Sequence, residues 1–192
     1  MGKEYSFYAR LLLSVEDIGR SQKYAQQLLV QVGGKLGSEE RLINEALRQA
    51  AVVSYGRVFN KSFPENRDHA HFVKIQYEQV VEKFNDRLSK QERSLHARML
   101  AMRDQVFAHS DAQSRGWQFS KGSPIAVGRN PFYPMENDEV KGLIGLTQHA
   151  VDVFYQELCK TKRKLSENNN FSCYFFLFNL FNVWVACLTN HM

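Results

Sequence analysis

The sequence contains little cysteine, and what it has lies late in the chain. Of its 192 residues, three are cysteines, Cys159, Cys173 and Cys187. They are odd in number and widely spaced, and no CxxC pair or Cys/His ligand spacing is present. This pattern argues against a disulfide framework and against a zinc site. It favours a reducing compartment, so we expect a cytoplasmic protein.

Several other signatures of function are missing. The N-terminal apolar run is short and interrupted by charge, unlike a secretory signal. There is no Gly-rich phosphate loop, no GxSxG nucleophile turn and no internal repeat. The net charge of +5 suits an anionic partner without identifying one. The length fits one domain that can bury a core without metal or disulfides.

Four amphipathic segments are present, and their apolar residues recur at three- and four-residue steps. The spacing predicts helices over residues 5–32, 39–60 and 137–165, and a third helical region over 70–111. It allows a break in that region near Ser89 but does not place it. We therefore expect an all-α protein, an antiparallel four- to five-helix up-and-down bundle over residues 1–165.

Between the third and fourth helical regions the composition changes. Residues 114–138 hold three of the four prolines and several glycines, which predicts a long loop, with room for a small hairpin. Its aromatics (Trp117, Phe119, Phe132, Tyr133) alternate with basic residues (Arg115, Lys121, Arg129). That mixture suits stacking on single-stranded RNA, and equally a hydrophobic anchor for the loop.

The tail, residues 166–192, differs from the rest of the chain. Its apolar stretch 171–188 approaches the length of a membrane-spanning helix, and the basic segment 160–164 precedes it. Asn179 and Asn182 would be costly in lipid unless they were paired. We favour an extra element packed on the bundle, and keep a C-terminal membrane anchor as the minority alternative.

The segment RDQVFAHSD, residues 103–111, brings chemistry-bearing groups into an otherwise apolar helix. Arg103 offers a permanent charge and a planar fork of donors that matches phosphate oxygens. His109 can exchange a proton near neutral pH. Together they are sufficient in principle for phosphodiester cleavage without metal, with proton transfer by His109 and charge stabilisation by Arg103.

Helix geometry complicates this interpretation. Residues six apart differ by about 600° of rotation, so Arg103 and His109 do not share one face of a straight helix. The pair could form where the helix ends near Ser110 and Asp111, or at a two-fold axis that doubles each group. The alternative is that both are surface or interface residues, with Asp104 paired to Arg103 and Asp111 capping the helix.

The string MRDQVFAHSD resembles the Arg-x(4–6)-His motif of HEPN (higher eukaryote and prokaryote nucleotide-binding) domains. A polar residue, Asp104, directly follows the arginine, and the sequence is similar to proteins of phage abortive-infection systems. AVVSYGRVFNKSF, residues 51–63, resembles the second helix of that group. The resemblance covers residues 5–165 and leaves out the tail.

The resemblance implies a dimeric all-α bundle with the motif near the dimer interface. Many HEPN domains are metal-independent endoribonucleases of toxin–antitoxin or phage-defence systems. Arg103 and His109 would then be the catalytic pair, Asp104 would help to orient them, and no cofactor or metal is implied. The expected partners are RNA and a second copy of the chain, with an antitoxin protein as a further candidate.

One position departs from the family pattern. HEPN toxins paired with a nucleotidyltransferase antitoxin often carry a tyrosine two residues after the histidine, where this chain has Asp111. Control by adenylylation is therefore in doubt. Some HEPN domains lack demonstrated nuclease activity, so a non-catalytic RNA-, nucleotide- or protein-binding module remains the alternative function.

Four further residues need an interpretation. His96 lies seven residues before Arg103, on nearly the same helix face. It either extends the site towards RNA or is a surface histidine, and we favour the surface histidine. Arg57 either approaches the motif or serves as an ion-pair partner. His69 and His71 sit two apart, but no third ligand is apparent nearby, which favours a solvated helix start over a metal site.

Overall fold

The computed structural model describes residues 2–31, 39–60, 69–107, 118–119, 126–127 and 135–168. These residues form an all-α bundle, which confirms the fold class expected from the sequence. A two-stranded hairpin is the one additional element of the described part. The elements are α1 (Lys3–Val30), α2 (Glu39–Val58), α3 (Ala70–Arg87), α4 (Lys90–Phe107), β1 (Gln118–Phe119), β2 (Ala126–Val127) and α5 (Asn137–Asn168).

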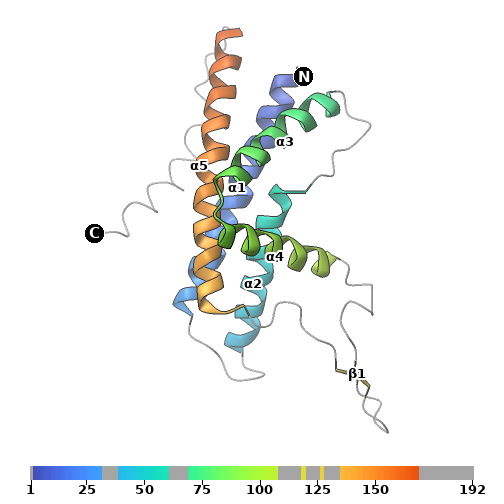
Figure 1. The fold of residues 1–192 in the computed structure, drawn as a ribbon, viewed down its shortest axis with the longest axis vertical. Coiled ribbons are helices and arrows are strands. Elements are labelled where there is room, and N and C mark those ends of the chain that lie inside the picture. Colours follow the sequence, from blue (N-terminus) through green and yellow to red (C-terminus); the bar gives the residue numbers. More distant parts are fainter. Residues whose placement is uncertain are drawn as a thin grey trace, which may run out of the picture.

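The long helices alternate in direction. Figure 1 shows α1, α2 and α5 side by side, with α1 antiparallel to both neighbours, and α3 inclined along the same bundle. The fourth helix differs from a simple up-and-down arrangement, because α4 runs across α2 and α5 instead of along them. This crossing brings the residues of α4 against the C-terminal half of α2, where the candidate site lies.

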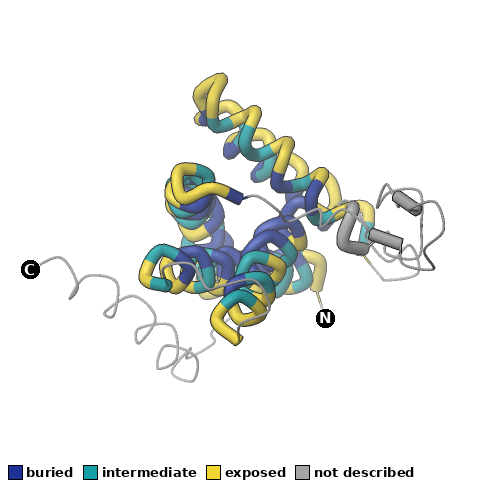
Figure 2. Tube along the Cα trace, turned by 90° about the horizontal axis from the view of Figure 1, so that it is seen from below, coloured by how far each residue is buried: buried dark blue, intermediate teal, exposed yellow. Residues whose placement is uncertain are grey.

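The apolar stripe of α1 forms one wall of the core. Leu11, Val15, Ile18 and Leu28 are buried, as their spacing predicts. Burial of one such side chain contributes about 1.5–3 kcal/mol. Figure 2 shows that the buried side of the helices faces the centre of the bundle.

The third helical region is broken near Ser89, where the sequence allowed a break. Leu88 has an extended backbone, Ser89 lies outside both helices, and α4 begins at Lys90. The Ser89 hydroxyl accepts a hydrogen bond from the Glu92 backbone N–H at 3.3 Å, and the Glu92 carboxylate accepts one from the Ser89 N–H at 2.9 Å. This reciprocal pair is a capping box, which the sequence SKQE supplies.

The predicted hairpin is present within the segment that joins α4 to α5. Gln118 pairs with Val127, and Phe119 with Ala126, in an antiparallel arrangement. Trp117, Phe132 and Tyr133, as well as the basic residues Arg115, Lys121 and Arg129, lie outside the described residues.

The C-terminal helix runs slightly farther than predicted. α5 continues to Asn168, three residues beyond the expected end at 165. Within the described part of the chain, no helix is both long enough and apolar enough to cross a membrane. The apolar stretch 171–188 lies outside the described residues, so the alternatives for the tail stay predictions.

Candidate functional site

The side chain of Arg103 is held at the crossing of α4 and α2. Its Nη1 donates a hydrogen bond to the Gly56 carbonyl oxygen at 2.7 Å, and its Nε donates to Asp104 Oδ1 at 2.8 Å. Nη2 donates to the same Asp104 oxygen. The Arg103 side chain is only 14% exposed. A long cation this enclosed has lost most of its rotamer freedom and presents its guanidinium in one orientation.

A glycine makes this arrangement possible. An added Cβ at Gly56 would lie 2.4 Å from Arg103 Cδ and within 3 Å of its Cγ and Cβ. Those distances are far below van der Waals contact, so α4 could not approach α2 this closely with a larger residue there. Gly56 thus provides both the space for the Arg103 stem and the carbonyl that receives its Nη1.

The two charged side chains of the Arg103 cluster, which consists of Arg103, Asp104 and Gly56, differ in exposure. The Asp104 side chain is 65% exposed, whereas the guanidinium it binds is largely covered. A guanidinium has five N–H donors, and the bonds to Asp104 and Gly56 use three of them. Two N–H groups are left by these bonds for another acceptor. The arrangement can therefore fix a cation at the end of α4 and still offer donors to an anion.

The structure places two of the three predicted site residues. Arg103 and Asp104 are hydrogen-bonded to each other, which is the pairing expected under the non-catalytic alternative. His109 lies outside the described residues, as does Asp111, and α4 ends at Phe107, two positions before the histidine. The pairing of Arg103 with His109 stays a prediction.

The interpretation of His96 as a surface histidine is correct only in part, because the residue is half-buried. Its ring lies within an aromatic cluster from α2 and α3, with centroid distances of 4.6 Å to Phe59, 5.5 Å to Phe84 and 5.7 Å to Tyr55. Its Nδ1 is 2.8 Å from the Tyr55 hydroxyl oxygen. The sequence could not reveal this, because the enclosing rings come from other helices.

Burial changes the protonation of both members of this pair. It lowers the pKa of His96 to about 4, and it raises the pKa of Tyr55 above its ordinary value. At neutral pH the imidazole is therefore uncharged and the phenol keeps its proton. A protonated phenol can donate to the unprotonated Nδ1 of a neutral imidazole. His96 is thus a packed hydrogen-bonding residue without the positive charge that phosphate binding would use.

Arg57 is an ion-pair partner, which was one of the two roles expected for it from the sequence. Its Nη1 lies 3.8 Å from Asp17 Oδ1 on α1. Desolvation by burial raises the pKa of Asp17, while the nearby charges of Arg57 and Arg20 oppose that rise. Arg57 neighbours Gly56 in sequence, but it contacts α1 and not the Arg103 cluster.

No metal centre is evident where the structure is described. His69 and His71 stand at the start of α3, and no group of three or more His, Cys, Asp or Glu side chains gathers in the described part of the chain.

The comparisons with known proteins give no support for a family. No protein-family model, curated protein or solved structure matches the chain significantly. The resemblance to HEPN domains therefore depends on the motif residues and the helical layout alone.

Sequence reasoning missed the role of Gly56, although a signal was present. A glycine inside a helix costs about 1 kcal/mol relative to alanine, and such a residue often marks a close approach of another backbone or side chain. Gly56 lies in the last turn of α2, two residues before the helix ends at Val58. Its partner could not be identified from the sequence, because the crossing of α4 over α2 is a tertiary feature.

Proposed function

We propose that the protein is a metal-independent endoribonuclease of HEPN type, in which Arg103 and His109 act on the scissile phosphate. The observation that supports this is that hydrogen bonds to Asp104 and to the Gly56 carbonyl hold the Arg103 guanidinium in place near the end of α4. A guanidinium held by a carboxylate and a carbonyl is preorganised to receive charge, which is the main way in which enzymes stabilise phosphoryl transition states.

In the proposed reaction, the ribose 2′-oxygen attacks the adjacent phosphorus and the bond to the 5′-oxygen breaks. One His109 accepts the 2′-hydroxyl proton, and a proton from an imidazolium is delivered to the leaving 5′-oxygen. Arg103 balances the charge that develops on the non-bridging oxygens. The products are a 2′,3′-cyclic phosphate and a 5′-hydroxyl. One P–O bond forms and one breaks, and the proton taken from the 2′-hydroxyl is balanced by the proton given to the 5′-oxygen.

We further propose that the active form is a homodimer. A two-fold axis near the end of α4 would supply two copies of His109, one as the base and one as the acid. This removes the difficulty that Arg103 and His109 cannot share a face of one straight helix. A role in a toxin or phage-defence system follows from the same resemblance, and the cysteine pattern favours the cytoplasm as its location. Its antitoxin, if it has one, would act by a route other than adenylylation, because Asp111 replaces the tyrosine.

A second candidate is a non-catalytic helical module that binds RNA, a nucleotide or a protein. The observation that favours it is that Asp104 and Gly56 already occupy three Arg103 donors. In that case Arg103 would join α4 to α2 and take no part in chemistry.

Cleavage of RNA in EDTA by matched variants separates the two candidates. We expect His109→Ala to abolish cleavage and Arg103→Ala to lower it by about 10²–10³-fold, as loss of one transition-state donor does. His71→Ala and Arg87→Ala change exposed residues of α3 and should cleave like the wild type. Equal activity of His109→Ala and wild type, with dimerisation intact, would contradict the nuclease proposal. Binding of labelled RNA without cleavage by the folded wild type would support the second candidate.

A further inference from the structure

The outer face of α2 carries an apolar stripe that no described helix covers. α2 packs along α1 and is crossed by α4, and these contacts bury one side of it (Figure 1). On the other side Leu42 is 64% exposed and Ile43 is 42% exposed, and Ala46 is exposed as well. Ala50 and Val53 continue the stripe and are half-buried. A contiguous apolar patch of this kind marks an interaction surface.

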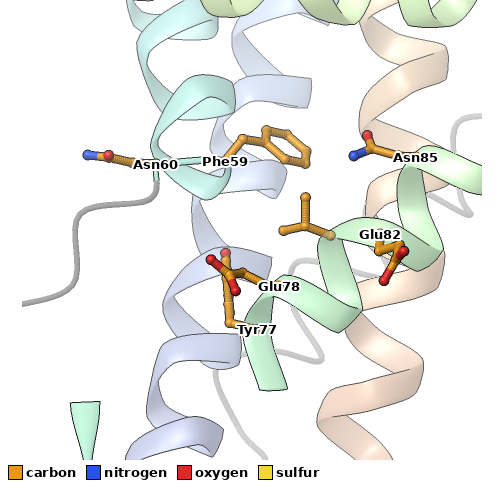
Figure 3. A pocket seen from close by; sticks show the side chains of 7 residues that line it. Phe59, Asn60, Tyr77, Glu78, Glu82 and Asn85 are labelled. Carbon is orange, nitrogen blue, oxygen red and sulfur yellow. The ribbon is translucent and has the colours of Figure 1, made fainter. Parts of the chain in front are cut away.

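The inner side of α2 is already occupied by the core. Tyr55 and Val58 are buried there, and Phe59, directly after the helix, packs on Phe84 at a centroid distance of 5.1 Å. Phe59 also lines a cavity of about 320 Å³ against α3, where Figure 3 shows it together with Asn85. No residue of the stripe lines this cavity. The stripe is therefore a surface separate from both the core and the cavity.

The stripe follows the heptad spacing of a coiled coil. Its positions are separated alternately by four and three residues, at 39, 43, 46, 50, 53 and 57. The four central positions are apolar, and the two end positions are charged. A seam with this spacing packs against a second helix, whose side chains fill the gaps between its own. The spacing therefore indicates that a helix is the occupant.

The stripe is complementary to itself when two copies of α2 pack antiparallel. A two-fold axis midway between positions 46 and 50 places Ala46 opposite Ala50 of the second copy, and Ile43 opposite Val53. The small side chains beside the axis let the two helices approach closely, and the larger ones cover the contact on each side. A two-fold contact uses the same patch on both copies, so it requires this kind of self-complementarity.

The same alignment pairs opposite charges at both ends of the stripe, where Glu39 lies opposite Arg57 of the second copy. Glu39 forms no ion pair or hydrogen bond within the described part of the chain. Arg57 is exposed, and its contact with Asp17 at 3.8 Å is longer than a hydrogen bond. In a parallel arrangement each residue would face its own copy, and like charges would meet at both ends. Charge complementarity therefore favours a second copy in the antiparallel direction.

We propose that two copies of this chain associate through the outer faces of their α2 helices, packed antiparallel. This inference specifies the interface of the homodimer in the proposed function, and it rests on that homodimer but not on RNA cleavage. Gly56, which accepts the Arg103 hydrogen bond, directly precedes Arg57 at the end of the stripe. At 1.5 Å per helical residue, each Arg103 cluster then lies about 12 Å along α2 from the two-fold axis.

Sedimentation velocity of the full-length protein without RNA tests the proposal. We expect a dimeric wild type. Arg57→Glu and Glu39→Arg should each raise the dissociation constant at least about tenfold, because each places like charges opposite one another at both ends. An equimolar mixture of these two variants should associate like the wild type, because every end contact then joins an acid to a base. Lys74→Glu makes the same charge change at an exposed residue of α3, and should alter the dissociation constant by about twofold or less.

A second pair of variants tests the apolar part of the stripe. Ile43→Asp should raise the dissociation constant at least about tenfold, because it buries an unpaired carboxylate in the contact twice. Ile75→Asp is the matched control, because Ile75 is an exposed isoleucine of α3 outside the stripe. It should associate like the wild type. Far-UV circular dichroism of each variant checks that the helices are retained.

Three results would overturn the proposal. One is a wild type that stays monomeric at high micromolar concentration. Another is wild-type association of both charge variants, or failure of their mixture to associate although each is folded. The third is an equal effect of Ile43→Asp and Ile75→Asp. These measurements contain no RNA, so a dimer that assembles as described and does not cleave would count against the nuclease proposal alone.

Discussion

Arg103 lies so close to Gly56 that a Cβ at residue 56 would overlap the Arg103 side chain. The Arg103 stem occupies the volume that a Cβ at residue 56 would need, and its guanidinium donates to the Gly56 carbonyl at 2.7 Å. The glycine thus sets the distance between α2 and α4 and holds the cation at the end of α4. This relationship gives the first prediction.

Gly56→Ala should displace Arg103 and lower stability. Overpacking of a buried contact costs about 1–3 kcal/mol, and the better helix propensity of alanine returns about 1 kcal/mol of this. A net fall in the free energy of unfolding is the expected result, measured by urea titration. Gly19→Ala is the matched control, because nothing lies within 4 Å of its added Cβ. Alanine there should leave stability unchanged or raise it, and equal effects at both positions would contradict the account.

The free energy of unfolding should fall as the pH is lowered, because His96 resists protonation in the folded protein. Its pKa is about 4 in the folded protein and about 6.5 in an unfolded chain. Between these values the unfolded chain binds a proton that the folded protein does not, so folding is progressively disfavoured as the pH drops. Above the unfolded pKa this contribution to stability is fully present. Urea titrations at pH 7 and pH 5 measure the loss, and His96→Gln should reduce it.

Direct observation of the His96 ring checks the same prediction. Its imidazole ¹H–¹³C resonance should stay at the position of the neutral form from pH 7 to pH 5. A midpoint near 6.5 for this ring in the folded protein would show that it is not enclosed by Tyr55, Phe59 and Phe84.

The hydroxyl of Tyr77 should contribute to the joining of α1, α2 and α3. It donates to the Val58 carbonyl oxygen at 2.7 Å and lies 2.6 Å from Ser14 Oγ. Val58 is the last residue of α2, where carbonyls lack helical partners. Tyr77→Phe should therefore lower the free energy of unfolding by about 1–3 kcal/mol. Tyr5→Phe, at an exposed tyrosine of α1, should change it by less than about 0.5 kcal/mol. An unchanged free energy of unfolding in Tyr77→Phe would contradict the assigned hydrogen bonds.

The helices could be predicted because their determinants are local. The periodic stripe of α1 identifies its buried residues, and SKQE specifies the break at Ser89 through a capping box. The tertiary contacts could not be predicted in the same way. The burial of His96 depends on rings supplied by α2 and α3, and the close approach at Gly56 depends on α4 crossing α2. Both are contacts between different elements, as much as 47 residues apart along the chain, which periodicity does not encode.

The candidate site was predicted in part for the same reason. Arg103 and Asp104 are adjacent in sequence, so their contact follows from local geometry. The Gly56 carbonyl comes from another helix and was missed. The relation of Arg103 to His109 depends on how the chain leaves α4 and on the contact between two copies, neither of which the spacing of the motif determines.

Analysis of the RNA ends produced in EDTA tests the central claim most directly. Purified wild-type protein and His109→Ala would be incubated with a mixed RNA pool, and the new 3′ and 5′ ends would be mapped. The account predicts cleavage by the wild type alone, with 2′,3′-cyclic phosphate and 5′-hydroxyl ends. Products with 3′-hydroxyl and 5′-phosphate ends, or the same products from His109→Ala, would contradict it.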